Sequence, residues 1–389
     1  MSASSVLVQA VPRLVGRYAS GSGAKLVVLG GIHGNEPAGL RAGERVLRRL
    51  QELAPAFAGE IVVIAGNTRA LAADRRFLSK DLNRQFTPER VAAIRSSAES
   101  ERTDPEDAEM FELLQVLDAE LGAAGGAAYY LDLHTTSAEG IPFVLFGDTL
   151  RNRAFADHVP LPIILGLEEQ LDGTLLEHVN RQGYVTLGCE GGQHSSPAAV
   201  ENHASLIWLA LFHAGILGTE LPEVQEARVR LRRARGSRPH LVEVRYRHSI
   251  GPRDGFRMEP GFSSFDRVAP GRLLARDVRG EVRARWAGWV LMPLYQGLGE
   301  DGFFLASDVQ PFWLFVSTML RRARLAVLLQ LLPGVTRHRD REDSLVVDTR
   351  IARWFPLEIF HLFGFRKLRW HGPVLIVSRR PHDLSPPTR

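Results

Sequence analysis

The chain has 389 residues, of which 45% are hydrophobic and 24% charged, a composition typical of a globular protein and unlike that of a disordered one. It holds a single cysteine, which excludes a framework of disulfide bonds within the chain and favours a reducing compartment. We find no signal-peptide pattern and no uninterrupted apolar run of about 18 residues, so we expect a cytoplasmic protein without a membrane span.

The net charge of +4 is unevenly distributed. Residues 311–389 hold 14 of the 48 Lys and Arg residues but only 6 of the 44 Asp and Glu residues. An arginine-rich segment of this kind can bind an acidic partner. We favour solvated arginine side chains on packed helices, and we expect no nucleic-acid partner because no nucleic-acid-binding motif accompanies the charge.

Short apolar runs alternate with helical patterns over residues 1–225. Apolar runs closed by glycine or polar residues predict buried strands, and spacings of three and four apolar residues predict helices. The alternation predicts an α/β domain with a mixed sheet flanked by helices. The expected strands are 25–29, 61–65, 128–133, 141–146 and 184–189, and the expected helices are 37–53, 107–121 and 200–214.

The pattern changes twice after residue 225. Residues 223–238 are charged without an apolar face and predict a linker. Residues 236–310 are short segments separated by Gly, Pro and Asp, which predicts a small β-rich domain covering the site. Residues 311–389 predict a basic, partly helical C-terminal extension, with helices at 312–332 and 351–365 and a strand at 374–378. A membrane-surface helix is one interpretation of 312–332, and we favour a helix packed on the protein.

Two motifs combine into a candidate metal centre. GGIHGNEPAG (30–39) places His33 and Glu36 just after a predicted strand, and DLHTTS (132–137) places His134 at the end of another. Ligands of α/β sheets bind at such strand ends. Either motif alone is as well explained by a surface turn or a buried histidine. Together, two imidazoles and a carboxylate form the three-ligand set of a catalytic zinc, one ion per chain.

Further polar residues surround this set in the sequence. Asp81 in KDLNRQF (80–86) and Asp132 are candidates to orient the zinc-binding histidines. Arg69 in GNTRAL, with Asn83 and Arg84, offers donors for a carboxylate or a developing oxyanion. In TLGCEGGQH (186–194), Glu190 ends a predicted strand and is a candidate general base, with His194 as a candidate polar contact.

The motifs GGIHGNEPAG, NTRA, DLNRQF, DLHTTS and CEGGQH, in this order, resemble the succinylglutamate desuccinylase/aspartoacylase family, which has a zinc-carboxypeptidase-like fold. The resemblance covers about residues 20–310. It implies zinc on His33, Glu36 and His134, Glu190 as base, Arg69 polarising the scissile carbonyl, Asn83 and Arg84 holding the substrate's α-carboxylate, and a β-domain that narrows the entrance. Tyr295 in MPLYQ lies in the segment that would face the substrate.

One expected feature of the family is missing. Aspartoacylase-type enzymes grip a second substrate carboxylate with an arginine upstream of the catalytic glutamate. Around Thr174–Leu175 the chain has no equivalent, and Arg181 is the nearest arginine. This departure weakens the case for N-acetylaspartate or succinylglutamate as substrate.

Three functions remain open from the sequence. The first is hydrolysis of the amide of a small N-acyl amino acid by a zinc-bound water, with Glu190 as base. The second is a metallocarboxypeptidase acting on peptides, because the DLNR and DLH motifs recur there; the HGNE form and the β-domain favour the deacylase. The third is a catalytically silent zinc-containing binding protein, against which the presence of Glu190 argues. A homo-oligomer is compatible with all three.

Overall fold

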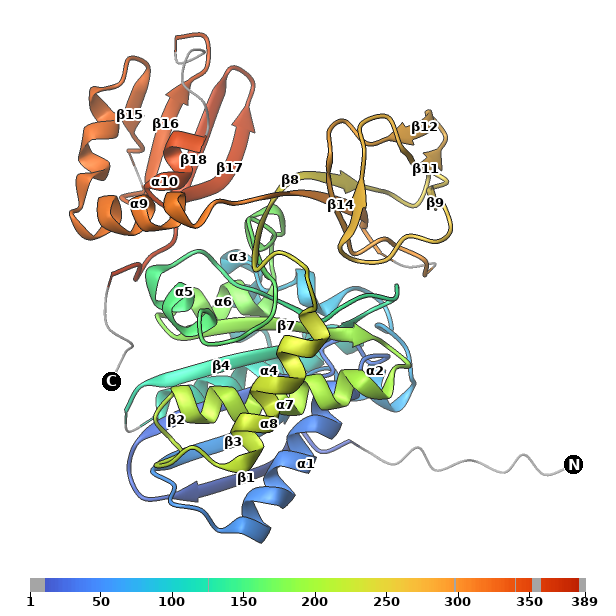
Figure 1. Cartoon of the computed structure of the whole chain (residues 1–389), viewed down its shortest axis with the longest axis vertical. Helices are drawn as coiled ribbons and strands as arrows, with labels where there is room; N and C mark the ends of the chain where they lie inside the picture. Colours follow the sequence, from blue (N-terminus) through green and yellow to red (C-terminus); the bar gives the residue numbers. More distant parts are fainter. Residues whose placement is uncertain (1–10, 125, 297–298, 340, 352–357, 385–389) are drawn as a thin grey trace, which may run out of the picture.

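A large mixed sheet forms the centre of the molecule. The computed structural model describes residues 11–124, 126–296, 299–339, 341–351 and 358–384 (Figure 1). Within them, eleven strands form one sheet in the order β1-β3-β2-β4-β7-β5-β6-β8-β14-β13-β10. The strands are β1 (Leu14–Ser20), β2 (Ala24–Gly30), β3 (Gly59–Ala65), β4 (Ala128–Thr136), β5 (Phe143–Leu145), β6 (Ile163–Leu165), β7 (Val185–Gln193), β8 (Leu241–Ser249), β10 (Asp266–Val268), β13 (Gly288–Leu291) and β14 (Asp301–Asp308).

The middle of this sheet is parallel. β2 pairs in parallel with β3 and β4, and β4 pairs in parallel with β7. β2 and β3 contain continuous runs of Val, Ile and Leu, and nearly all their residues are buried, as expected for strands covered on both faces. Their carboxyl ends therefore meet at one edge of the sheet. The predicted strands and the mixed α/β sheet are confirmed for this part of the chain.

Helices cover both faces of the sheet. One hydrophobic core joins α1, α7 and α8 to the sheet, and a second joins α3, α4 and α6 to its other face. The three predicted helices correspond to α1, α4 and α7. The helices are α1 (Ala38–Leu53), α2 (Thr68–Ala72), α3 (Pro88–Ser96), α4 (Pro105–Gly122), α5 (Leu150–Ala156), α6 (Leu175–Arg181), α7 (Pro197–His213) and α8 (Pro222–Arg235).

The linker prediction for residues 223–238 was wrong. α8 occupies most of this segment and buries Val224, Ala227 and Leu231. The three residues have helical spacing, but they form an apolar stripe only one residue wide. Because charged residues surround this stripe, the amphipathic pattern is not recognised from the sequence.

The β-rich segment 236–310 is confirmed, and it is continuous with the central sheet. β8, β10, β13 and β14 extend that sheet, while β9 (Arg257–Met258), β11 (Leu273–Asp277) and β12 (Gly280–Arg283) form a separate three-stranded sheet. A core of its own lies between them, including Phe262, Leu274 and Phe303. In Figure 1 this part stands above the strand ends of the parallel sheet.

The C-terminal extension contains helical segments, but the sequence did not predict its main feature. Its main feature is a four-stranded antiparallel sheet in the order β15-β16-β18-β17, with a small core of its own. The predicted strand at 374–378 is confirmed as β18. The elements are α9 (Pro311–Arg322), the 3-10 helix η4 (Leu325–Leu331), β15 (Val335–Arg337), β16 (Ser344–Asp348), α10 (Glu358–Leu362), β17 (Phe365–His371) and β18 (Val374–Arg379).

Both predicted helices of the extension are shorter than expected. The first ends at Arg322, and Arg324 adopts a left-handed conformation (φ 54°) that breaks the α-helix before η4 begins. Of the second, residues 352–357 lie outside the described residues, and the described part is helical only at Glu358–Leu362. Within the described residues, no helix is long and apolar enough to cross a membrane.

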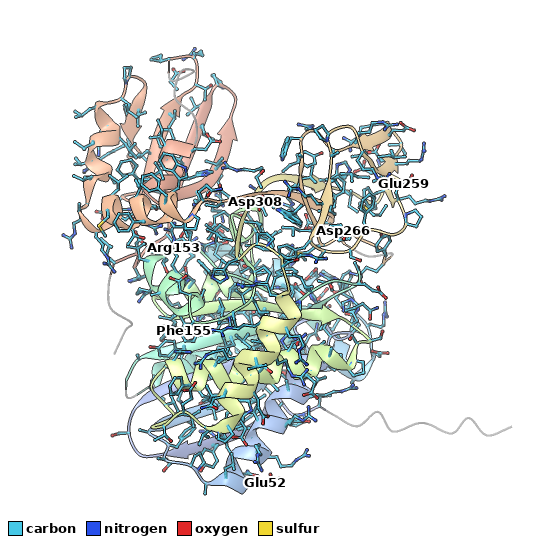
Figure 2. The ribbon with its side chains drawn as sticks, in the orientation of Figure 1. Glu52, Arg153, Phe155, Glu259, Asp266 and Asp308 are labelled. Atoms are coloured by element: carbon cyan, nitrogen blue, oxygen red, sulfur yellow. The ribbon has the colours of Figure 1, made fainter. Side chains whose placement is uncertain are left out.

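The basic residues of the extension form buried ion pairs with the rest of the molecule. Arg321 and Arg366 both bind Asp148, which also binds Arg153 (Oδ1 to Nε, 2.6 Å). Arg153 lies at the junction with the C-terminal part in Figure 2. Further pairs across the same junction are Lys367 with Asp172 and Glu177, Arg369 with Asp172, and Arg380 with Glu169. The expectation of solvated arginine side chains was therefore wrong for Arg321, Arg366 and Arg380, whereas other arginines of the extension are exposed.

We expect Asp148→Asn to be strongly destabilising. Burial alone would raise the pKa of Asp148, but the charges of Arg153, Arg321 and Arg366 overcome this and hold the pKa well below its usual range. Removing the carboxylate would leave three buried guanidinium groups without their common partner, at a cost of about 3–5 kcal/mol. Because the folded-state pKa is depressed, this stabilisation is present at neutral pH and is lost only as the pH falls through that depressed value.

Urea unfolding followed by circular dichroism measures the effect. Asp348→Asn is the matched control, because Asp348 pairs with Arg350 at the surface, where an ion pair contributes little. Equal losses in the two variants would contradict a structural role of the buried cluster.

Candidate active site

Two neighbouring strands bring the predicted metal ligands to one edge of the sheet. His33 and Glu36 follow β2, and His134 lies near the end of β4. The turn after β2 depends on glycine. Gly31 has a left-handed φ of 69°, and a Cβ at Gly34 would lie 2.1 Å from the backbone of Ala70. The glycines of GGIHG are therefore required by the backbone of this turn, which places His33 at the edge of the sheet.

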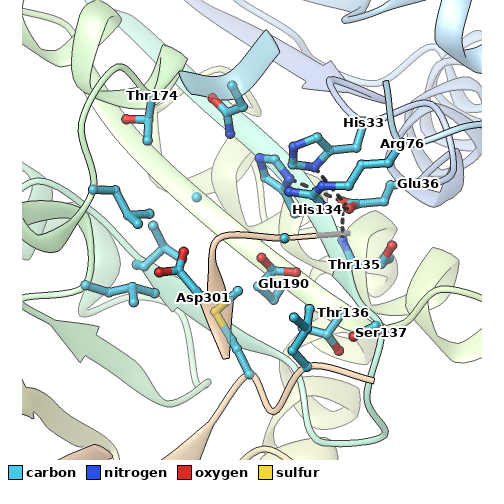
Figure 3. Close-up of a pocket in the computed structure, with 18 of the residues that line it drawn as sticks. His33, Glu36, Arg76, His134, Thr135, Thr136, Ser137, Thr174, Glu190 and Asp301 are labelled. Atoms are coloured by element: carbon cyan, nitrogen blue, oxygen red, sulfur yellow. Dashed lines mark hydrogen bonds and ion pairs between the residues drawn. The ribbon is translucent and has the colours of Figure 1, made fainter. Parts of the chain in front are cut away.

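The two histidines and the glutamate point toward one another (Figure 3). His33 Nδ1 lies 3.0 Å from one carboxylate oxygen of Glu36, and His134 Nδ1 lies 3.2 Å from the other. One ligand atom of each residue lies within 4.8 Å of the other two, a grouping that could hold a metal ion. Burial opposes the charge of Glu36, but the two histidines hold its pKa well below the usual range.

The other nitrogen of each ring has an acidic partner. His33 Nε2 lies 3.1 Å from Asp81, and His134 Nε2 lies 3.3 Å from Asp132. Zinc-binding histidines almost always have a carboxylate, backbone carbonyl or water at the second nitrogen, which fixes the ring and leaves the first nitrogen for the metal. The residues present therefore fit a zinc ion, and Asp81 and Asp132 lie where the sequence placed them.

We expect His134→Ala to lower the metal content of the purified protein. The substitution removes one of three donors and leaves Glu36 with one histidine, so the ion loses a third of its protein ligands. Atomic emission spectroscopy measures zinc per chain. His158→Ala, which changes an exposed histidine stacked on His213, is the control and should keep the wild-type content. One zinc ion per chain in the His134 variant would show that the ligand set is wrong.

Glu190 lies beside this group on β7. In the ladder between β4 and β7 it is the direct neighbour of His134, and Figure 3 shows its carboxylate in the same pocket. The residue is buried, and burial raises the pKa of its carboxyl group. Among the described residues its Oε2 has no hydrogen-bond partner. A buried carboxylate with a free oxygen and a raised pKa is suited to accept a proton.

The prediction for Arg69 was wrong in its placement. Arg69 lies on α2 and binds Glu109 (2.6 Å) and Glu112 (2.8 Å), away from the pocket. The cause is local, because Asn67 caps α2 by accepting from Ala70 N, and the helix then directs Arg69 toward α4.

Arg76 occupies the place that was expected for Arg69. Its guanidinium lies 3.0 Å from Asp81 and 3.4 Å from Glu36, and it lines the pocket. In the sequence, Arg75 and Arg76 precede Asp81 by six and five residues, so both were visible as candidates. The sequence pattern does not show which arginine faces the pocket.

Asn83, Arg84 and His194 all line the pocket. Asn83 accepts a hydrogen bond from Leu175 N (2.9 Å), which joins the DLNR turn to α6. Arg84 faces Asp301 at 3.5 Å and Glu300 at 3.7 Å. His194 Nδ1 lies 2.8 Å from the hydroxyl of Thr135.

Tyr295 does not line the pocket, so its expected place beside the substrate was wrong. Its hydroxyl accepts from Phe262 N and donates to Glu259 O, both at 2.9 Å, which ties it within the β-rich part. Its neighbours on the same segment line the pocket instead, from Met292 to Leu294 and from Gly299 to Asp301.

The pocket itself is small, with a volume of about 120 Å³. One wall carries the metal-ligand candidates, Arg76 and Glu190. A second wall is mainly apolar and was not predicted. Leu145 and Leu176 lie against Gly188, which is two positions before Glu190 on β7. A Cβ at Gly188 would meet Leu145 at 3.1 Å and Leu176 at 3.2 Å. The remaining members of this wall are Leu167, Glu168, Leu171 and Thr174.

Comparisons with known proteins agree with this architecture. Residues 22–197 match the model of the succinylglutamate desuccinylase/aspartoacylase catalytic domain. A solved succinylglutamate desuccinylase/aspartoacylase from Rhodobacter sphaeroides shares the fold, with a TM-score of 0.56 at 22% identity over 76% of this chain and 88% of that one. The fold is therefore the mixed α/β fold of these proteins.

Curated relatives cover a shorter stretch. A succinylglutamate desuccinylase from Burkholderia cenocepacia is 32% identical over 112 residues, 29% of this chain and 30% of that protein. An N-acyl-aromatic-L-amino acid amidohydrolase (carboxylate-forming) from Rattus norvegicus is 33% identical over 115 residues, 29% and 34% of the two lengths. The matches thus span about a third of these relatives. The motif resemblance to this family is confirmed, since residues 22–197 match the model of its catalytic domain.

Proposed function

We propose that the protein hydrolyses the amide bond of a small N-acyl amino acid and is zinc-dependent. The observation that carries the proposal is the meeting of the His33–Glu36–His134 donor set, the buried carboxylate of Glu190 and Arg76 in one small pocket. This pocket lies in a catalytic domain whose relatives are named as desuccinylases and amidohydrolases.

Zinc bound by His33, Glu36 and His134 would act as a Lewis acid and lower the pKa of water at the site. Glu190 accepts a proton as the water oxygen attacks the amide carbon. Arg76 donates hydrogen bonds to the carbonyl oxygen while that oxygen gains negative charge. As the C–N bond breaks, Glu190 returns the proton to the amine, and the products are a carboxylate and a free amino acid.

Two residues of the DLNR turn are suited to hold the substrate's α-carboxylate. Arg84 lies 3.5 and 3.7 Å from its acidic neighbours, contacts too long for strong charge-assisted hydrogen bonds. One of its terminal nitrogens donates to Asn83 O (2.9 Å), and its remaining donors are available to a substrate. Asn83 and His194 add polar groups on the same pocket wall. We assign these residues to substrate binding.

The acyl group is proposed to be small and uncharged. Of the described residues that line the pocket, only Arg76 and Arg84 are arginines, and both are assigned above. Arg181, the nearest candidate in the sequence, is half exposed and lies 3.8 Å from Glu177, outside the pocket. A second carboxylate would therefore meet leucines and Glu168, and burying an unpaired charge there is costly.

A panel of zinc-loaded reactions tests the proposal. N-formyl, N-acetyl and N-propionyl amino acids are compared with N-succinylglutamate, N-acetylaspartate and a peptide library, and the released products are measured by liquid chromatography. We expect the highest kcat/KM for an uncharged acyl group. Trimming of peptide C-termini without turnover of any acyl amino acid would favour the carboxypeptidase, and zinc binding without any turnover would favour a silent binding protein.

A further inference from the structure

Helix α9 is amphipathic, and its apolar side faces solvent. Phe312, Phe315 and Met319 follow the i, i+3, i+7 spacing of one helix face, and they are 62%, 62% and 42% exposed. The buried residues of the helix are Ser317 and Arg321, on the opposite face. They are anchored by the hydrogen bond of Ser317 to Leu362 O and the ion pair of Arg321 with Asp148. The helix therefore packs on the protein, as predicted, through the side that carries Leu314, Ser317 and Arg321, and not through Phe312, Phe315 and Met319.

The following 3-10 helix, η4, also exposes large apolar side chains. Val327, Leu328 and Leu331 are exposed, Leu331 by 79%, and Trp313 lies against Phe312 with ring centroids 5.3 Å apart. Seven of the thirteen exposed large hydrophobic side chains of the described residues fall between positions 312 and 331. Single exposed hydrophobic residues need no explanation, but a cluster of this kind marks a binding surface. We call these seven residues the α9 face.

The surroundings of the α9 face are basic. Residues 311–339 contain five arginines and neither Asp nor Glu. Arg322, Arg324, Arg337 and Arg339 are exposed, and no ion pair of theirs is seen among the described residues. Val327 of the α9 face lines a hollow that Arg324, Arg337 and Arg339 also line. Acidic residues line the same hollow: Asp343 pairs with Arg379, Asp383 pairs with Arg321, and Glu342 is exposed.

We infer that the α9 face binds the surface of an anionic lipid bilayer. Aromatic and aliphatic side chains flanked by arginines are the pattern of an interfacial helix, in which the apolar groups enter the headgroup boundary and the arginines meet lipid phosphates. Charge decides between a bilayer and a second copy of the chain. Two copies meeting through this face would bring their arginines together, whereas an anionic surface neutralises them.

The face is also fixed before any partner binds. The ion pairs of Arg321 and Arg366 with Asp148 hold the C-terminal part on the α/β sheet, so little conformational freedom is lost on binding. The helix has 12 residues and lies along the surface of the protein, so the expected mode is attachment to one leaflet.

Vesicle co-sedimentation of the full chain tests the inference. We expect binding to vesicles that contain phosphatidylglycerol, much weaker binding to pure phosphatidylcholine, and release by added salt. Phe312→Ser/Phe315→Ser/Leu331→Ser should abolish binding, and Arg324→Glu/Arg337→Glu should weaken it by about tenfold or more. All substituted residues are exposed, so the unfolding temperature of each variant should match the wild type.

Two control variants separate the face from general surface effects. Val229→Ser/Val278→Ser removes exposed hydrophobic residues elsewhere, and Arg41→Glu/Arg48→Glu makes the same charge change on α1. Both should bind vesicles as the wild type does. Three results would overturn the inference: no binding to anionic vesicles, equal binding by the triple variant, or a dimer in light scattering that the triple variant dissociates.

Discussion

Glu190→Gln is expected to lose nearly all turnover while keeping its zinc. Glutamine has almost the same size as glutamate but does not accept and return a proton, and general acid–base catalysis contributes about 10²–10⁴-fold to rate. The proposed metal ligands are His33, Glu36 and His134, so zinc per chain should not change. Steady-state hydrolysis of the best N-acyl amino acid, with atomic emission on the same preparation, measures both quantities.

A pH profile sharpens this test. Burial raises the pKa of the Glu190 carboxyl group, and a base works only when ionised. The value of kcat/KM should therefore fall as the pH drops through this raised pKa and reach a plateau above it. A bound cation would move this acidic limb to lower pH. Glu44→Gln, an exposed glutamate on α1, is the control. Near-normal turnover in Glu190→Gln would overturn its role as base.

Arg76→Ala is expected to reduce kcat by about 10²–10³-fold, the effect of losing one donor to a developing oxyanion. Arg69→Ala is expected to leave kcat close to that of the wild type, because Arg69 binds Glu109 and Glu112 outside the pocket. The loss of this partly exposed pair should lower the free energy of unfolding by only about 0–1 kcal/mol. We thus expect a large loss of kcat in Arg76→Ala and almost none in Arg69→Ala.

Chemical rescue distinguishes catalysis from a merely structural effect. Arg76 also contacts Asp81 and Glu36, so its removal could disturb the metal ligands. We expect Arg76→Ala to keep its zinc and to regain part of its activity when guanidinium ions are added. A large loss in Arg69→Ala, with Arg76→Ala unaffected, would restore the original assignment from the sequence.

The place of the candidate ligands could be predicted because buried strands, and therefore the positions where they end, can be recognised in the sequence. Apolar runs such as KLVVL and AYYLDL are long enough to be recognised as buried strands, and the residues that follow parallel strands must meet at one edge. His33, Glu36, His134 and Glu190 needed no further information. Arg76 could not be distinguished from Arg69, because the direction of a side chain after a strand depends on local turns and caps.

The C-terminal part was harder to predict for a different reason. β17 and β18 pack only one face on a small core, and charged residues such as Arg366 and Lys367 interrupt the apolar alternation. Their partners, Asp148, Glu177 and Glu243, lie more than 120 residues earlier. Ion pairs between residues so far apart in the sequence leave no periodic pattern. The sequence therefore showed that the segment is basic but not which acidic residues its side chains bind.

Zinc titration of metal-stripped protein tests the central claim most directly. The protein is freed of metal with a chelator, zinc is added in steps, and release of the free amino acid from an N-acyl amino acid is followed. We predict no turnover without zinc, a rise that saturates at one ion per chain, and no rise in a His134→Ala variant. Full turnover by the metal-free protein, or saturation without turnover of any acyl amino acid, would contradict the account.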